Sequence, residues 1–235
     1  SKERIEAIWN QEEPDRVPIG EFGYINRDIV ETILHESSRD MERREALLRE
    51  EGMLQDKEWL QEERYKRDFR LKMSFFRKAG LDFALHTGIA VPKAYETKQV
   101  NGNIHIDYWG RKWDTSKAND MMPWLIDSPI KSWEDFEKLE IPAYIEDEHC
   151  YRFVDMALEE AGEEYAVISG HQAPMTFARL LRGTKDFLID FYRDPSFTEK
   201  LMDFSMELAQ RVCDRYVEHG IEILHFNDDL GDTHG

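Results

Sequence analysis

Residues 223–235 read Ile223-Leu-His-Phe-Asn-Asp-Asp-Leu-Gly-Asp-Thr-His-Gly235. An apolar run followed directly by acids, amides and imidazoles is typical of a buried parallel strand that carries polar groups at its carboxyl end. In α/β proteins that end of the sheet is where ligands bind. The stretch therefore predicts an α/β fold, with a candidate site beside Asn227, Asp228 and Asp229.

Earlier parts of the chain alternate between strand and helix patterns. Apolar runs that end in glycine or a polar group predict strands at 17–23, 81–88 and 165–170, with the fourth at 221–227. Helical periodicity or helix-forming composition predicts helices at 2–11, 27–35, 38–80, 148–162, 174–182, 185–193 and 195–220. Strands that alternate with helices in this way favour βα units and a parallel sheet.

Two local signals interrupt this alternation. Residues 94–115 alternate polar and apolar side chains around Asn101-Gly102, which is a strong indication of a β-hairpin. Ser132 is followed three residues later by Asp135, as in a capping box, and predicts the start of a helix. Leu201, Phe204, Leu208 and Val212 recur at helical spacing and are expected to form a core stripe.

Composition excludes several classes of function. The chain has 235 residues and a formal net charge of −18, which argues against a nucleic-acid partner or an anionic membrane surface. Two cysteines are too few for a disulfide framework, and no apolar run reaches the length of a membrane span. Together with a charged N-terminus unlike a signal peptide, these features predict a cytoplasmic protein. No G-x-G-x-x-G or Walker loop follows the first predicted strand.

Several segments resemble the uroporphyrinogen decarboxylase superfamily. They are residues 13–19 (EPDRVPI), 107–113 (DYWGRKW), 128–139 (SPIKSWEDFEKL), 183–195 (GTKDFLIDFYRDP) and the final Asn-Asp-Asp-Leu-Gly. The resemblance implies a TIM (β/α)8 barrel, of which residues 1–235 would hold the first four βα strands as one incomplete domain, with 94–115 as a hairpin insertion. A barrel cut at its midpoint exposes sheet edges, so this chain alone is expected to aggregate, to dimerise, or to owe its order to chain beyond these residues.

The superfamily has two main branches, and the chain looks closer to the corrinoid-dependent methyltransferases. That branch moves methyl groups between small methylated substrates, of the methoxy or methylamine type, or coenzymes, and corrinoid proteins. The alternative is decarboxylation of uroporphyrinogen in porphyrin biosynthesis, whose arginine-rich loop is replaced here by residues 21–27 (EFGYINR). A substrate with many carboxylates requires fixed cationic groups, and a site offering Glu21, Asp228 and Asp229 would repel it. A non-catalytic binding barrel is a third possibility.

Polar residues at the ends of the predicted strands form the candidate site. In the last strand His225, Asn227 and Asp229 share one face, and Leu224 and Phe226 the other, which is expected to meet helices. We predict catalytic roles for Asp228, Asp229 and His171, and substrate-binding roles for Glu21, Asn227, His225, His86 and Trp109. The structural alternatives are that an acid of the last strand caps a helix, that His171 binds a loop carbonyl, and that Trp109 packs in the hairpin.

The resemblance also suggests cofactors and partners. It implies a small-molecule substrate, a corrinoid carried by a partner protein and, in many members, zinc held by a His-x-Cys pair and a later cysteine. Those ligands would fall beyond residue 235, and Cys150 and Cys213 have no partner at ligand spacing, so no metal ligand is assigned within this chain. A homodimer is a further possibility.

Overall fold

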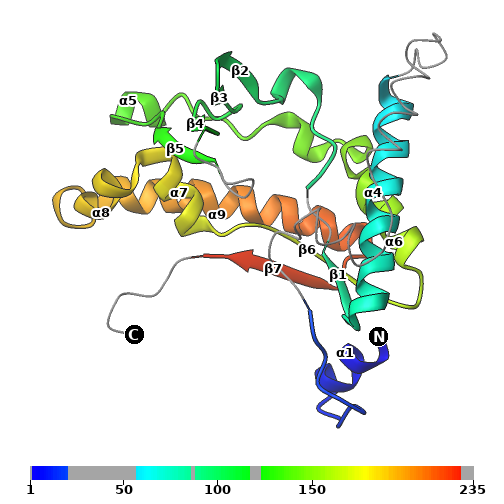
Figure 1. Ribbon diagram of the computed structural model, residues 1–235. Coiled ribbons are helices and arrows are strands. Elements are labelled where there is room, and N and C mark those ends of the chain that lie inside the picture. The colour runs from blue at the N-terminus through cyan, green and yellow to red at the C-terminus, as the bar shows by residue number, and fades with distance from the viewer. Residues whose placement is uncertain (1, 21–56, 86–87, 117–122, 229–235) are drawn as a thin grey trace. The chain divides into compact units, whose positions relative to one another are not determined.

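The structure is a computed structural model that describes residues 2–20, 57–85, 88–116 and 123–228 (Figure 1). The predicted helix at 27–35 and the first part of the one at 38–80 lie outside these residues. The chain divides into two compact units. Unit 1 comprises Ser1–Gly88, Arg152–Ser169 and His219–Ile223, and unit 2 comprises Ile89–Tyr151, Gly170–Glu218 and Leu224–Gly235.

Unit 1 is built around two packed helices, α4 (Lys57–Ala79) and α6 (Arg152–Ala161). Phe69, Met73 and Phe76 recur at helical spacing on α4 and are buried, as are Val154, Ala157 and Ala161 on α6. The rings of Tyr65 and Phe153 stack between the two helices, with centroids 4.5 Å apart. The charged residues of α4 include Arg70 and Arg77, which pair with Glu160 and Glu164.

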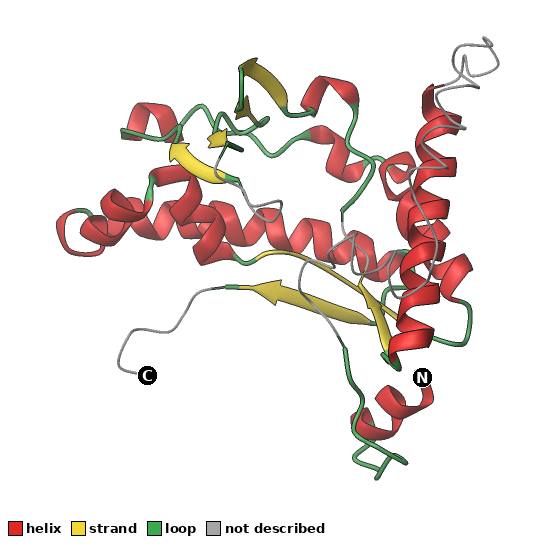
Figure 2. Ribbon diagram, in the orientation of Figure 1, coloured by secondary structure: helices red, strands yellow, loops and turns green. Residues whose placement is uncertain are grey.

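The strands of the main sheet follow the order β1-β6-β7, with β1 at Phe83–Leu85, β6 at Ala166–Gln172 and β7 at Ile223–Asn227 (Figure 2). In unit 1, β1 pairs in parallel with β6, and Phe83 lies opposite Ala166. Parallel pairing of strands separated by helices is the predicted α/β arrangement. The predictions of strands at 81–88, 165–170 and 221–227 are thus confirmed in position, although β1 and β7 are shorter and β6 both begins one residue later and ends two residues later.

The predicted first strand is not formed in the part of it that the structure describes. Residues 17–20 are not in a strand, and 21–23 lie outside the described residues. Ile19 O accepts a hydrogen bond from Asp82 N at 2.7 Å, but Ile19 N donates to the Asp82 carboxylate at 2.8 Å instead of to a backbone carbonyl. A side chain therefore takes the place of the second ladder bond, and no strand pairing develops.

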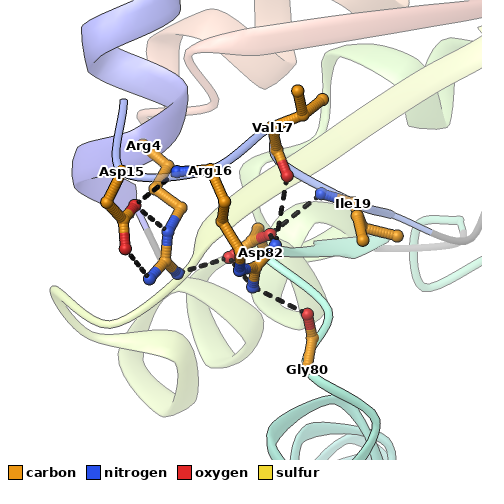
Figure 3. A network of polar contacts seen from close by, with 7 residues as sticks. All are labelled: Arg4, Asp15, Arg16, Val17, Ile19, Gly80 and Asp82. Carbon is orange, nitrogen blue, oxygen red and sulfur yellow. Dashed lines mark hydrogen bonds and ion pairs between the residues drawn. The ribbon is translucent and has the colours of Figure 1, made fainter. Parts of the chain in front are cut away.

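A polar network fixes the N-terminal segment of unit 1, which includes helix α1 (Lys2–Trp9) (Figure 3). The side chain of Asp82 is fully buried and accepts hydrogen bonds from Arg4 Nη1 at 2.8 Å and Arg16 Nη1 at 2.6 Å. Arg4 also binds Asp15, and Arg16 donates to the carbonyl of Gly80 at 2.9 Å. The Pro-Asp-Arg motif at 14–16 thus has a structural role in linking α1 to the start of β1.

Unit 2 contains a helical layer and a small antiparallel sheet. Helices α7 (Pro174–Arg182), α8 (Thr184–Arg193) and α9 (Pro195–Glu218) pack against one another, as predicted from periodicity. Leu201, Leu208 and Val212 of the predicted stripe are buried, and Phe204 is half-buried. The remaining helical elements of this unit are short: η1 (Lys93–Tyr95), α5 (Trp133–Phe136), η2 (Ala143–Glu146) and η3 (Glu148–Tyr151).

The predicted hairpin is confirmed and is part of a larger sheet of order β2-β3-β4-β5. Strands β2 (Lys98–Asn101) and β3 (Ile104–Ile106) meet at Gly102, whose φ of +51° suits the turn. The sheet continues through β4 (Lys112–Asp114) and β5 (Trp124–Asp127), which the sequence did not predict. Ser132 and Asp135 form the predicted capping box at α5.

The described helices are each too short or too polar to span a membrane.

One apolar side chain departs from expectation. Phe226 of β7 was expected to face helices, but it is 47% exposed. Strand β7 ends the order β1-β6-β7, and no described helix covers Phe226.

Candidate active site at the carboxyl ends of β6 and β7

The carboxyl ends of β6 and β7 lie side by side within unit 2. Ala173 N, just after β6, donates to the carbonyl of Asn227 at 3.3 Å. A Cβ atom on Gly170 would fall 1.7 Å from the carbonyl oxygen of His225, so only glycine permits the strands to approach this closely. This approach places His171 and Gln172 of β6 beside the polar end of β7.

His171 is held in one orientation at the end of β6. Its Nδ1 lies 2.7 Å from the carbonyl oxygen of Gln172, and its ring centroid lies 5.8 Å from that of Phe177. A carbonyl oxygen can only accept, so Nδ1 carries the proton and Nε2 keeps its lone pair in the neutral imidazole. Nε2 is therefore the ring atom able to accept a proton or hydrogen bond from a ligand.

The surroundings of His171 favour the neutral imidazole. Burial lowers the pKa of His171 below its ordinary value, because the charged form loses hydration. The hydrogen bond to the Gln172 carbonyl opposes this shift, and the positive charge of Arg111 adds to it. His171 is thus suited to act as a base or hydrogen-bond acceptor at neutral pH.

A compact turn between β3 and β4 presents Arg111 to this region. Asp107 accepts three hydrogen bonds, from Arg111 N at 3.0 Å, Arg111 Nε at 2.6 Å and Trp113 Nε1 at 2.9 Å. Gly110 closes the turn by donating its N–H to Asp107 O. Both partners of the Asp107–Arg111 ion pair are largely buried, and the carboxylate fixes the direction of the guanidinium.

Arg111 reaches the end of β6 from this turn. Its Nη1 donates to Gln172 Oε1 at 3.2 Å, and its guanidinium carbon lies 5.2 Å from the ring centroids of both Trp113 and Phe177. The edge of Trp109 also meets Phe177, at 5.1 Å between centroids. Phe177, which is buried on α7, is therefore a packing surface shared by His171, Arg111 and Trp109.

Asp228 follows β7 and caps helix α7. Its Oδ1 accepts hydrogen bonds from Thr176 N at 2.9 Å and from Thr176 Oγ1 at 2.6 Å. Thr176 is the third residue of α7, so the carboxylate satisfies a backbone donor of the first turn and lies at the positive end of the helix dipole. Helix α7 precedes Asp228 in the sequence, so this cap links the end of β7 to the start of α7.

Comparison with known proteins assigns the family. The family model described as uroporphyrinogen decarboxylase (URO-D) matches residues 115–234, just over half of the chain. The chain belongs to the URO-D family. The match includes β6, β7 and the helices between them, so the elements that carry His171, Asn227 and Asp228 are family elements.

A solved structure supports the same fold. A methyltransferase from Methanosarcina mazei matches 95% of this URO-D family chain with a TM-score of 0.59 and 16% sequence identity. The chain covers 57% of that protein, so it spans little more than half of its length. At this identity the likeness concerns the fold alone. A search of the curated proteins found no match.

The structure places the other predicted site residues of this URO-D family member as follows. Asn227 is exposed at the end of β7, and His225 is half-buried in the same strand. Trp109 packs edge-on against Phe177 and Phe204, the hairpin packing that was its structural alternative. The predicted residues that lie outside the described part of the chain are Glu21, His86 and Asp229.

Sequence reasoning missed Arg111, Asp107, Gln172 and Thr176 as members of this region. The segment 107–113 was noted only for its family resemblance. Its signal was an acid four residues before an arginine across a glycine, which can close a tight turn. Thr176 gave no signal, because its partner Asp228 lies 52 residues away.

The described residues offer no evident metal centre. They contain no group of three or more His, Cys, Asp or Glu side chains able to hold a metal ion. Cys150 and Cys213 are both buried and outside any disulfide, and burial raises the pKa of Cys213 to about 11. A protonated buried thiol is a poor ligand and a poor nucleophile.

Proposed function

We propose that the protein is a methyltransferase of the URO-D family, which moves a methyl group between a small methylated substrate and a corrinoid carried by a partner protein. Family membership supports an enzyme of this superfamily. The name of the solved Methanosarcina mazei protein, a methyltransferase of the same fold, favours this branch. Zinc and corrinoid contacts are assigned to no residue that the structure describes.

The observation that carries the proposal is that Arg111 is already paired with an acid. Among the described residues it is the arginine that hydrogen-bonds the end of β6, and Asp107 already neutralises it through a 2.6 Å ion pair. Porphyrin decarboxylation requires cationic groups that are available to several substrate carboxylates. A paired arginine, a carboxylate bound to α7 and a neutral His171 suit a substrate with little negative charge.

Each described site residue has a distinct part in this proposal. Nε2 of His171 would take the proton of a hydroxyl or thiol that gains the methyl, or accept a hydrogen bond from a protonated amine that loses it. The exposed amide of Asn227 would orient the substrate. Asp228, through its cap on α7, would fix the end of β7 and so the position of Asn227. Corrinoid chemistry, supplied by the partner, would provide the methyl carrier.

The direct test is a methyl-transfer assay with the full-length protein, its cognate corrinoid protein and a panel of methoxy, methylamine and thiol substrates. Methylation would be followed by the visible absorption of the corrinoid. We expect turnover in the wild type and a loss of at least about tenfold in His171→Gln, since general base catalysis contributes about 10²–10⁴-fold.

Uroporphyrinogen is the matching control substrate. Formation of coproporphyrinogen without methyl transfer would show the family's decarboxylase activity and reject the proposal. If neither reaction occurs but a ligand binds, the chain is the non-catalytic barrel that the sequence leaves open.

A further inference from the structure

Gln172 connects two parts of the site that the proposed function does not otherwise link. Its side-chain oxygen accepts the hydrogen bond from Arg111 Nη1, and its backbone carbonyl accepts the proton on His171 Nδ1. Asp107 fixes the other edge of the guanidinium through Nε. The chain of contacts thus runs from the β3–β4 turn to the imidazole.

The second imidazole nitrogen is left for a ligand. No described residue hydrogen-bonds His171 Nε2. Because Nδ1 carries the proton, Nε2 holds a lone pair.

We propose that Arg111 is a positioning residue for His171: by holding Gln172, it keeps the imidazole in the tautomer whose Nε2 lone pair faces the substrate. This inference rests on the proposed function for the use made of Nε2. The ligand group at Nε2 is a hydrogen-bond donor, such as a hydroxyl, a thiol or a protonated amine. His171 is the group that touches substrate, and Arg111 acts through it.

Charge supports the same assignment. Among the described residues, the charged or titratable groups on the elements around His171 are Arg111 and Asp107 in the β3–β4 turn, Arg179 and Arg182 on α7, His225 in β7 and Asp228 after it. Arg179 donates to Thr184 Oγ1, and Arg182 pairs with Asp190. Asp107 is turned to Arg111, and Asp228 is turned to α7. Arg111 is the charge that acts on His171, and it opposes protonation. The charge of Arg111 thus favours the neutral form of His171.

The test is an NMR titration of the His171 ring nitrogens in the full-length protein, with His171→Gln used to assign the signals. In Arg111→Gln we expect the pKa of His171 to rise. In Gln172→Met, which leaves the Arg111–Asp107 pair intact, we expect the fraction protonated at Nδ1 to fall. Arg193→Gln removes an exposed charge at the end of α8 and should change neither.

Gln172→Met also guards against a folding failure, because Arg111→Gln leaves Asp107 buried without its cation. Circular dichroism would establish that each variant is folded. If folded Arg111→Gln and Gln172→Met both keep the wild-type pKa and tautomer of His171, the proposal is wrong.

An activity arm separates positioning from direct binding. A positioning role predicts that the acid limb of the kcat/KM profile moves to higher pH in Arg111→Gln, while KM for the methyl donor changes little. A rise in KM with an unmoved pH profile would instead make Arg111 a substrate-binding residue and overturn the proposal. If the wild type transfers no methyl group, the NMR result still decides the role of Arg111.

Discussion

Asp228 directly follows β7, and its carboxylate accepts hydrogen bonds from the first turn of α7. Thr176 donates two hydrogen bonds to Asp228 Oδ1, one from its backbone N–H and one from its hydroxyl. Replacing the acid by an amide distinguishes a capping role from a catalytic role. Asparagine keeps an oxygen acceptor for the helix but cannot exchange a proton.

We therefore expect Asp228→Ala to lower the free energy of unfolding by about 1 kcal/mol, the usual cost of losing a cap. Asp228→Asn should lose only a fraction of that. Urea denaturation measures both. If Asp228→Asn is as stable as the wild type but transfers methyl groups more than tenfold more slowly, the carboxylate has a chemical role besides the cap.

Asp82 supports a different prediction, because its stabilisation depends on pH. Burial alone would raise the pKa of Asp82, but the N–H of Ile19 and the guanidinium groups of Arg4 and Arg16 more than offset it, and the pKa lies below its ordinary value. A carboxyl group with a lowered pKa stabilises the fold above its unfolded-state pKa. This stabilisation is lost as the pH falls from the unfolded-state pKa through the folded-state value.

We expect Asp82→Asn to cost about 2 kcal/mol at pH 7, as hydrogen bonds to charged groups do. The difference from wild type should shrink as the pH falls below about 4. Thermal or urea unfolding at a series of pH values measures it. Asp15→Asn, which removes the exposed acid of the same network, is the control and should have little effect. A pH-independent difference between Asp82→Asn and wild type would contradict the linkage.

At the residue scale, sequence reasoning found side chains at strand ends and missed those that arrive from elsewhere. His171, Asn227 and Asp228 were predictable because a strand delivers its last residues to one edge of the sheet. Arg111 and Thr176 were not, because their partners lie 61 and 52 residues away and no local pattern brings them together.

Among the elements, the close contact of β6 and β7 depends on Gly170. Any side chain there would meet the backbone of His225, which cannot rotate away as a side chain could. The separation of these strands sets the position of His171 relative to Asn227. A small change at Gly170 should therefore alter the site as well as stability.

We expect Gly170→Ala to destabilise the protein by more than about 2 kcal/mol, since the new methyl group must displace a strand. Gly102→Ala, in the open hairpin turn, should cost only about 1–2 kcal/mol, the penalty for a left-handed backbone conformation. Urea denaturation of the two variants measures the difference. Equal losses of stability in the two variants would show that the close contact of β6 and β7 at Gly170 adds no cost beyond that of an ordinary turn.

Elements with a strong period were the ones that the sequence predicted well. Helices α7, α8 and α9 and the hairpin at Asn101-Gly102 agree with their patterns. Strands β4 and β5 did not stand out, because Lys112–Asp114 and Trp124–Asp127 are only three and four residues long. Residues 17–20 have the composition of a strand, yet the Asp82 side chain occupies the hydrogen bond that pairing would use.

For the whole molecule, exposed apolar side chains lead to a prediction about association. Phe226 at the end of β7 is 47% exposed and Trp9 of α1 is 73% exposed. An exposed strand edge with apolar side chains favours pairing with another chain. We expect the 235-residue chain to sediment as species heavier than its 27.9 kDa monomer at micromolar concentrations.

Phe226→Lys should shift that equilibrium towards the monomer, because a charge on an edge strand opposes pairing. Val217→Lys alters an exposed apolar residue of α9 and serves as the matched control. Sedimentation velocity at several concentrations measures both. A wild-type chain that is monomeric throughout would show that this edge is protected.

The network around Asp82 also has a consequence for the order in which the protein is made. Arg16 and its carboxylate are 66 residues apart, and Arg4 lies earlier still. At about 5–20 residues per second, a ribosome needs roughly 3–13 s to synthesise that interval. Throughout that time helix α1 has been translated, but Asp82, the buried carboxylate that Arg4 binds, has not. Arg4 and Arg16 are thus synthesised before Asp82, the residue that fixes their place in the fold.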